Sequence, residues 1–109
     1  DTRTGMVSDD TLREIVARII EAMRPQKIIL FGSQARGNAS DQADIDLLII
    51  QEIDLPRHRR YAAVRRLFWG MGIPMDILVY TPEEFARFQS VPGSFTYTVA
   101  HEGKVLYEK

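Results

Sequence analysis

Apolar residues recur along this chain in two patterns, one typical of amphipathic helices and one typical of buried strands. In residues 9–23 they return every three or four positions, which predicts a helix with one buried face, capped by Ser8 or Asp9 and ended by Arg24 and Pro25. Residues 27–31 are almost continuously apolar, which predicts a strand covered on both sides. Further strands are predicted over residues 44–50, 75–80 and 104–107.

Turn and cap signals divide the rest of the chain. Leu55-Pro56 breaks it, and a helix over the region of Tyr61 to Phe68 is expected to end near Gly70 or Gly72. Thr81-Pro82-Glu83-Glu84 predicts the capped start of a short helix that reaches about residue 89, and a further helix is expected over residues 94–101. Residues 34–42 are rich in turn formers and predict a brief helical or looped segment.

The connection lengths predict how the strands pair. The first two predicted strands are close enough for antiparallel pairing, whereas the segment before the third contains a helix, the usual crossover between parallel neighbours. The expected fold class is therefore α/β (α+β), with a small mixed sheet of about four strands packed by helices. This topology brings the Gly32-Ser33 turn, Asp44, Asp46 and Asp76 to one edge of the sheet.

Three carboxylates at one sheet edge predict a metal site. Asp44 and Asp46 are one residue apart on a strand and therefore share a face, where their charges repel unless a cation lies between them. Hard oxygen ligands favour Mg²⁺ or Mn²⁺, and two such ions about 4 Å apart suit an in-line phosphoryl displacement. Asp76 would complete the site and could accept the proton of the attacking hydroxyl. The alternative is an acidic strand end that binds nothing.

A phosphate site is expected beside these acids. Gly32 allows close approach of the backbone, the amides and hydroxyl near Ser33 can hold phosphate oxygens, and Arg36 offers a charged fork. The alternatives are a plain turn glycine, a plain helix cap and a surface arginine.

Composition narrows the function classes. At 109 residues the chain is expected to form one domain, with residues 1–7 outside the fold and without a separate acceptor lobe. A net charge of −1 gives no basic field for general nucleic-acid binding, and the chain has no cysteine for disulfides or thiolate metal sites. No apolar stretch approaches the roughly 20 residues of a membrane span and no leader is apparent, so the cytoplasm is the expected compartment.

Two further features have more than one interpretation. The basic residues at 57–60 and 65–66 predict a solvated helix face, or alternatively a surface for an acidic partner or a tRNA-like acceptor. The aromatic residues Phe68, Trp69, Phe85 and Phe88 recur at helical spacing, which predicts core or a partner interface rather than a cofactor site.

Together the motifs resemble a known family. Leu30-Phe31-Gly32-Ser33, Ala35-Arg36-Gly37 and, ten residues after Ser33, Asp44-Ile45-Asp46-Leu47 are similar to the signature of the minimal nucleotidyltransferases (MNT domains) of the DNA polymerase beta superfamily. Met75-Asp76-Ile77 resembles the family's third carboxylate strand. The chain departs from many relatives at Ala43, where they carry serine.

The resemblance implies an enzyme that transfers AMP from ATP to a hydroxyl with Mg²⁺ or Mn²⁺ and releases pyrophosphate. It also implies a HEPN-domain toxin as partner, with this protein as the antitoxin of a HEPN/MNT pair that adenylylates a tyrosine. Two alternatives remain, namely an antitoxin that masks its partner without catalysis, and a transferase for small molecules or RNA ends.

Overall fold

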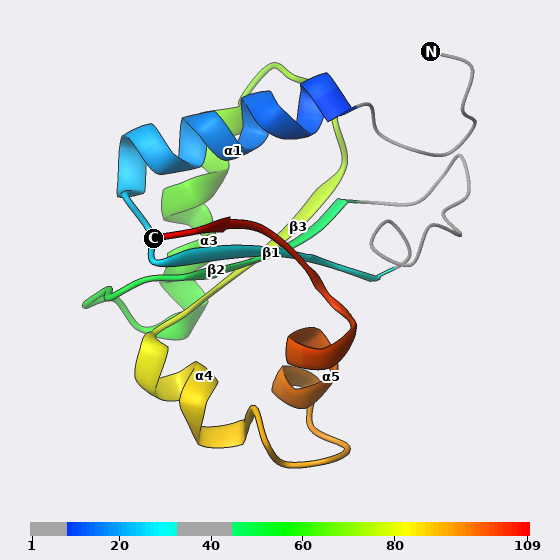
Figure 1. Ribbon diagram of the computed structural model, residues 1–109. Helices are drawn as coiled ribbons and strands as arrows, with labels where there is room; N and C mark the ends of the chain where they lie inside the picture. The colour runs from blue at the N-terminus through cyan, green and yellow to red at the C-terminus, as the bar shows by residue number, and fades with distance from the viewer. Residues whose placement is uncertain (1–8, 33–44) are drawn as a thin grey trace.

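The computed structural model describes residues 9–32 and 45–109 and contains a four-stranded mixed sheet with helices on both faces (Figure 1). The strands are β1 (Lys27–Phe31), β2 (Ile45–Ile50), β3 (Met75–Tyr80) and β4 (Lys104–Glu108). Their order in the sheet is β3-β2-β1-β4. Strand β1 pairs antiparallel with β2 and β4, whereas β2 and β3 are parallel, as the connection lengths predict.

The helices begin and end close to their sequence signals. They are α1 (Asp9–Met23), α3 (Arg57–Arg65), which continues into the 3-10 turn η1 (Arg66–Phe68), α4 (Pro82–Phe88) and α5 (Phe95–Glu102). Arg24 adopts a left-handed conformation (φ 50°) directly after α1, where the predicted stop lies. The predicted segment 34–42 lies outside the described residues.

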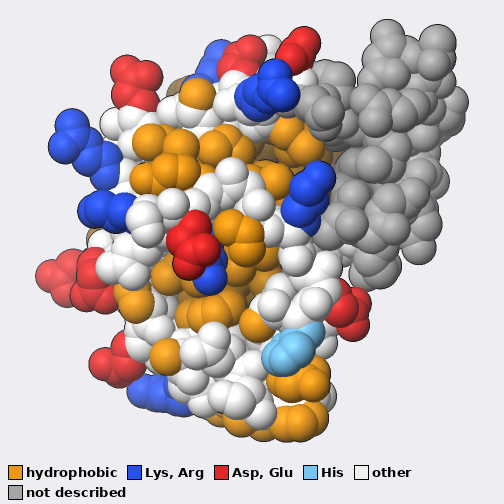
Figure 2. All heavy atoms as spheres, viewed as in Figure 1, with side chains coloured by type: hydrophobic (Ala, Val, Ile, Leu, Met, Phe, Trp, Pro, Cys, Tyr) orange, Lys and Arg blue, Asp and Glu red, His pale blue; other side chains and the backbone are white. Residues whose placement is uncertain are grey.

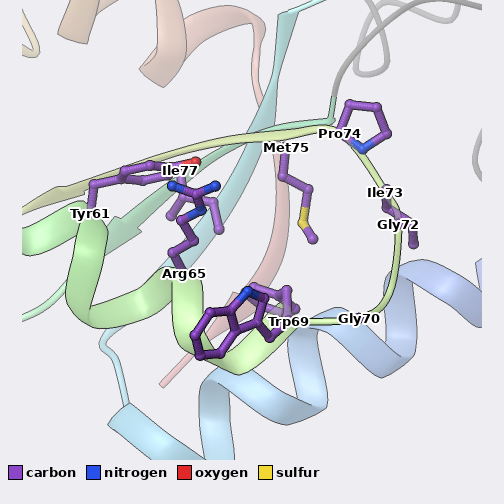
Figure 3. Close-up of a pocket in the computed structure, with 10 residues that line it drawn as sticks. Tyr61, Arg65, Trp69, Gly70, Gly72, Ile73, Pro74, Met75 and Ile77 are labelled. Carbon is purple, nitrogen blue, oxygen red and sulfur yellow. The ribbon is translucent and has the colours of Figure 1, made fainter.

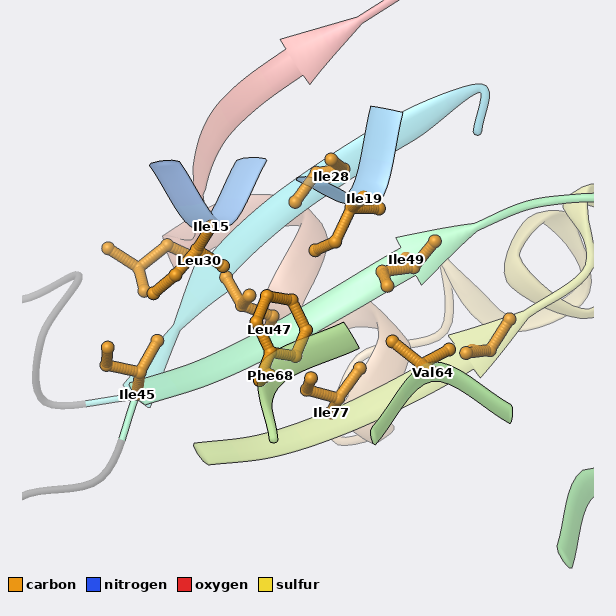
Figure 4. Close-up of a cluster of buried hydrophobic side chains, with 11 residues drawn as sticks. Ile15, Ile19, Ile28, Leu30, Ile45, Leu47, Ile49, Val64, Phe68 and Ile77 are labelled. Carbon is orange, nitrogen blue, oxygen red and sulfur yellow. The ribbon is translucent and has the colours of Figure 1, made fainter. Parts of the chain in front are cut away.

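The α1 and α3 face of the sheet carries the larger core (Figure 4). Ile15 and Ile19 of α1 and Val64 of α3 pack there against alternate residues of β1 and β2. The inward-facing side chains of β2 on this face are those of Ile45, Leu47 and Ile49, which are almost fully buried.

A smaller core covers the opposite face. Phe85 of α4 and Val99 of α5 pack there with Ile29, Leu48 and Ile50. Because neighbouring residues of β1 and β2 belong to different cores, both strands are covered on both faces.

Apolar side chains also reach the surface above the C-terminal strand, where Figure 2 shows them gathered over α1. A groove of about 410 Å³ lies between α1 and β4 and is lined mainly by Leu12, Val16, Ile20 and Leu106. Among the described residues, no helix is long and apolar enough to cross a lipid bilayer.

Candidate active site

The sheet register places Asp46 and Asp76 side by side. In the parallel ladder of β2 and β3, Asp46 is the direct partner of Asp76. In the antiparallel ladder, Asp46 lies opposite Phe31, so Gly32 follows at the same end. The prediction that these three positions converge at one edge of the sheet is confirmed.

Strand alternation sets the direction of the two acidic side chains. Ile45, Leu47 and Ile49 point into the larger core, so Asp46 projects to the other face, together with the buried Leu48 and Ile50. On β3, Ile77 and Val79 likewise pack into the larger core, so Asp76 shares the face of Asp46. Asp76 is exposed and Asp46 is partly buried, which gives an acidic rim next to an apolar interior.

Gly32 lies directly against the carboxylate of Asp46. Its backbone is left-handed (φ +76°), and a Cβ at this position would overlap Oδ2 of Asp46 and lie 3.2 Å from its Cγ. Glycine is therefore required here both by the backbone conformation and by the close approach of the acid. This contact ties the end of β1 to the acidic rim.

The other predicted site residues, Ser33, Arg36 and Asp44, lie outside the described residues. Within the described part, no cluster of three or more acidic, histidine or cysteine side chains forms a metal site. Asp46 and Asp76 nevertheless offer two carboxylates from adjacent strands on one face, a donor set of the hard-oxygen type that Mg²⁺ and Mn²⁺ prefer. These two residues fit a divalent cation.

An aromatic cluster that the sequence does not predict lies on the same side of the sheet. Phe95 of α5 contacts Phe31 edge-on, with ring centroids 5.3 Å apart, and lies 6.2 Å from Tyr80. The guanidinium of Arg57 stacks over Tyr80 at 4.9 Å. Strand alternation could have placed Tyr80 on this face, but no local signal links it to Phe95 or Arg57.

One residue of the basic segment at 57–60 and 65–66 is buried, although the sequence predicts a solvated helix face for the whole segment. Arg60 is only 7% exposed, and its guanidinium donates to the carbonyl oxygens of Leu55 (2.8 Å) and Val79 (3.1 Å) and to Oε1 of Glu84 (2.7 Å). The interpretation of this residue as part of a solvated face is wrong, because three acceptors converge on it. Arg59, Arg65 and Arg66 are exposed, as that interpretation requires.

The aromatic residues at helical spacing divide between core and surface. Phe68 and Phe85 are buried, whereas Trp69 is 84% exposed and Phe88 47% exposed. The core interpretation is confirmed for Phe68 and Phe85. Trp69 and Phe88 lie at the surface, so for them the alternative of a partner interface stays a prediction.

Asp46, Asp76 and Gly32 therefore meet at one edge of a mixed sheet, and the match to a family model identifies the class of protein that this chain belongs to. Residues 10–107 match the family model described as "Nucleotidyltransferase domain". The chain belongs to the nucleotidyltransferase domain family, and it is therefore an enzyme of the nucleotidyltransferase class.

Individual relatives support this assignment. The chain is 36% identical over 84 residues to the Methanocaldococcus jannaschii protein named "Putative protein adenylyltransferase MJ0604", covering 77% of this chain and 80% of that protein. The fold is similar to a crystal structure described as a nucleotidyltransferase from Sulfolobus solfataricus (TM-score 0.65, 21% identity, 92% of this chain and 79% of that one). It is also similar to a toxin-antitoxin crystal structure with AMP-PNP (TM-score 0.63, 20% identity, 89% and 73%).

Proposed function

We propose that this protein transfers AMP from ATP to a hydroxyl group of a partner polypeptide, and that the partner is a HEPN-domain toxin whose tyrosine is the acceptor. The proposal rests on one observation, the direct pairing of Asp46 with Asp76 on one face of the sheet, with the Asp46 carboxylate close against Gly32. Two of the relatives support the choice of nucleotide and partner. One is named as a protein adenylyltransferase, and the other is a toxin-antitoxin crystal structure with AMP-PNP.

In the proposed reaction the acceptor oxygen attacks the α-phosphorus of ATP. A phosphorus–oxygen ester bond forms, the bond to pyrophosphate breaks, and Asp76 takes up the hydroxyl proton. Asp44, Asp46 and Asp76 would hold Mg²⁺ or Mn²⁺, which supplies charge stabilisation for the phosphate oxygens when bound. Gly32 admits the phosphates close to the backbone, and Ser33 and Arg36 are proposed to contact them. We place the reaction in the cytoplasm, where ATP is available.

The test uses labelled ATP, Mg²⁺ and the product of the neighbouring gene, with mass spectrometry for an added AMP. Asp46→Asn and Asp76→Asn are each expected to reduce transfer by about 100-fold or more, because each removes a charge that acts on the reacting groups. Asp54→Asn changes the same side-chain type at an exposed position outside the site and should retain transfer. Near-normal transfer by both site variants would contradict the proposal.

A second candidate function is masking of the toxin by binding alone. Asp76→Asn separates the two, because it should still form the complex but fail to protect cells if transfer is required. Equal protection by wild type and Asp76→Asn, with no AMP transferred by the variant, would establish the masking function instead.

A further inference from the structure

Trp69 is the most exposed of the large apolar side chains that the structure describes, at 84%. It follows η1, whose last residue, Phe68, packs into the larger core. The chain leaves η1 at Trp69 with an extended backbone (φ −60°, ψ 127°), and the ring stays in water. Tryptophan is among the residues that contribute most to the affinity of protein–protein interfaces when they become buried. The exposed ring is therefore a candidate contact for another molecule.

A cavity of about 400 Å³ lies beside Trp69, between α3 and η1 on one side and the start of β3 on the other (Figure 3). The buried side chains of Phe68 and Ile77 contribute to its lining. Tyr61 and Arg65 border it from α3, and Figure 3 shows Arg65 extending toward the strand beside Tyr61. A cavity with a buried apolar lining and an aromatic rim suits an apolar side chain of a partner.

Arg65 places an unpaired positive charge at the rim of this cavity. In the part of the chain that the structure describes, no carboxylate lies within ion-pair distance of Arg65 or of the exposed Arg66. By contrast, Arg57 and Arg60, which lie on the same helix, both pair with Glu84. An acidic residue of a partner would therefore complement the charge at this rim.

The cavity also reaches the edge of the sheet at which the acids lie. Met75 lines the cavity and directly precedes Asp76, whose side chain lies on the opposite face of β3. Strand β3 is the last strand of the sheet at this edge, and both Pro74 and Asp76 are exposed. About three extended residues, at roughly 3.3 Å each, are enough to cross one strand. A polypeptide anchored in the cavity can therefore present a side chain to Asp76.

The lining of the cavity favours a polypeptide over a nucleic acid. Besides Arg65 and the hydroxyl of Tyr61, the side chains that line it are apolar. Interfaces with nucleic acids are more polar and carry much more positive charge than those between proteins. The net charge of the chain is −1, which gives no broad positive field for a phosphate backbone. Tryptophan, tyrosine and arginine around an apolar pocket are instead typical of a protein interface.

We propose that the acceptor polypeptide docks on the surface formed by Tyr61, Arg65 and Trp69, with an apolar side chain in the cavity and an acidic residue at Arg65. This inference rests on the proposed function and names the surface that recognises the partner. Docking there holds the partner at the edge of β3, so that its hydroxyl-bearing residue approaches Asp76 from the side of that strand.

Trp69 is the single tryptophan of the chain, so it can report its own burial. The experiment uses the full chain with fluorotryptophan at this position and the purified product of the neighbouring gene, without nucleotide. Addition of the partner should shift the single fluorine NMR signal. It should also make that signal less sensitive to replacement of H₂O by D₂O, because docking removes the ring from water.

Two variants test the apolar anchor and the charge separately. Trp69→Ala should raise the dissociation constant of the partner about tenfold. Arg65→Glu should raise it about tenfold as well, and this loss, unlike the first, should shrink at high salt. Arg59→Glu is the matched control, because it makes the same charge change at an exposed position of α3 that lies about 120° around the helix from Arg65. Val91→Ala, at a position 46% exposed, is the control for loss of an apolar side chain.

The outcomes separate docking from catalysis. Absence of a complex, an unchanged fluorine signal with the partner bound, or wild-type affinity of both Trp69→Ala and Arg65→Glu would overturn docking at this surface. AMP transfer to the partner in that case would leave the proposed function intact. A shift caused by purified tRNA but not by the partner would assign the surface to a nucleic acid and also overturn the inference. Docking with the expected losses, but without AMP transfer to the partner, would support the surface and contradict the proposed function.

Discussion

Glu84 provides a pH-dependent test of how α3 is attached to β3. Its Oε1 accepts from Arg60 at 2.7 Å and from the Thr81 amide at 2.8 Å, and its Oε2 lies 3.4 Å from Arg57. The hydrogen bond from Arg60, opposed by burial and assisted by Thr81 and the two positive charges, lowers the pKa of Glu84 to about 2. The same guanidinium binds Val79 at the strand edge, so this carboxylate stabilises the connection between helix and strand.

The size of the effect follows from the pKa. The change from the ordinary value of 4.5 to about 2, at 1.36 kcal/mol per pKa unit, corresponds to about 3 kcal/mol of folding free energy. Because the folded-state pKa is lowered, this stabilisation is complete above pH 4.5 and is lost as the pH falls toward 2. Glu84→Gln keeps an acceptor for the Thr81 amide but removes the charge, so it should destabilise by about 1–3 kcal/mol at pH 7.

Urea denaturation of wild type and Glu84→Gln across pH 2 to 7 measures this difference. The two free energies of unfolding should converge toward pH 2, since the wild-type carboxyl becomes neutral there. Glu83→Gln is the matched control, because Glu83 pairs at the surface with Arg87, the one ion-pair partner it has among residues 9–32 and 45–109, and its side chain is 83% exposed. A constant difference between Glu84→Gln and wild type at every pH would refute the assigned role of the charge.

Two glycine substitutions test close approaches in the fold. Gly32→Ala should displace the Asp46 carboxylate and reduce AMP transfer by about 100-fold. Gly93→Ala has a similar φ, and no atom of the described residues lies within 4 Å of its new Cβ, so it should cost stability only. Equal transfer by both variants would contradict the role of Gly32. Gly103→Ala places a Cβ 2.5 Å from Ile29 Cγ2 and from the Val99 carbonyl, so it should destabilise by about 1–3 kcal/mol in urea denaturation, and an unchanged midpoint would contradict the packing described.

Local sequence signals were sufficient for most of the fold. The prediction that Thr81 begins a helix is confirmed by a complete capping box, in which Thr81 and Glu84 exchange hydrogen bonds at 3.1 and 2.8 Å. Ser94 likewise caps α5 by accepting from the Tyr97 amide at 3.0 Å. These signals act over three or four residues, so they can be recognised without tertiary information.

Interactions between distant segments could not be predicted in the same way. Arg60 appears in a strongly basic run, and its burial depends on acceptors from Leu55, Val79 and Glu84, which the fold brings together. Phe95 meets Phe31 only because α5 packs on the face of β1 opposite to α1. In both cases the sequence shows which side chain is present, but the residues that this side chain contacts depend on how distant segments pack together.

The candidate site could be predicted in part, because its geometry depends on the register of the strands, which the pattern of apolar residues indicates. The side-chain period of a strand is two, so a slip of one residue between β2 and β3 would send Asp76 into the larger core and leave Asp46 without its neighbour. Ile77 and Val79 oppose that slip, since each would leave the core for the surface. The apolar pattern of β3 therefore fixes the position of its acid. The same alternation that aligns Asp76 with Asp46 buries Ile77 and Val79 against the α3 side of the sheet, so the position of the acid and the packing of α3 have a common structural origin.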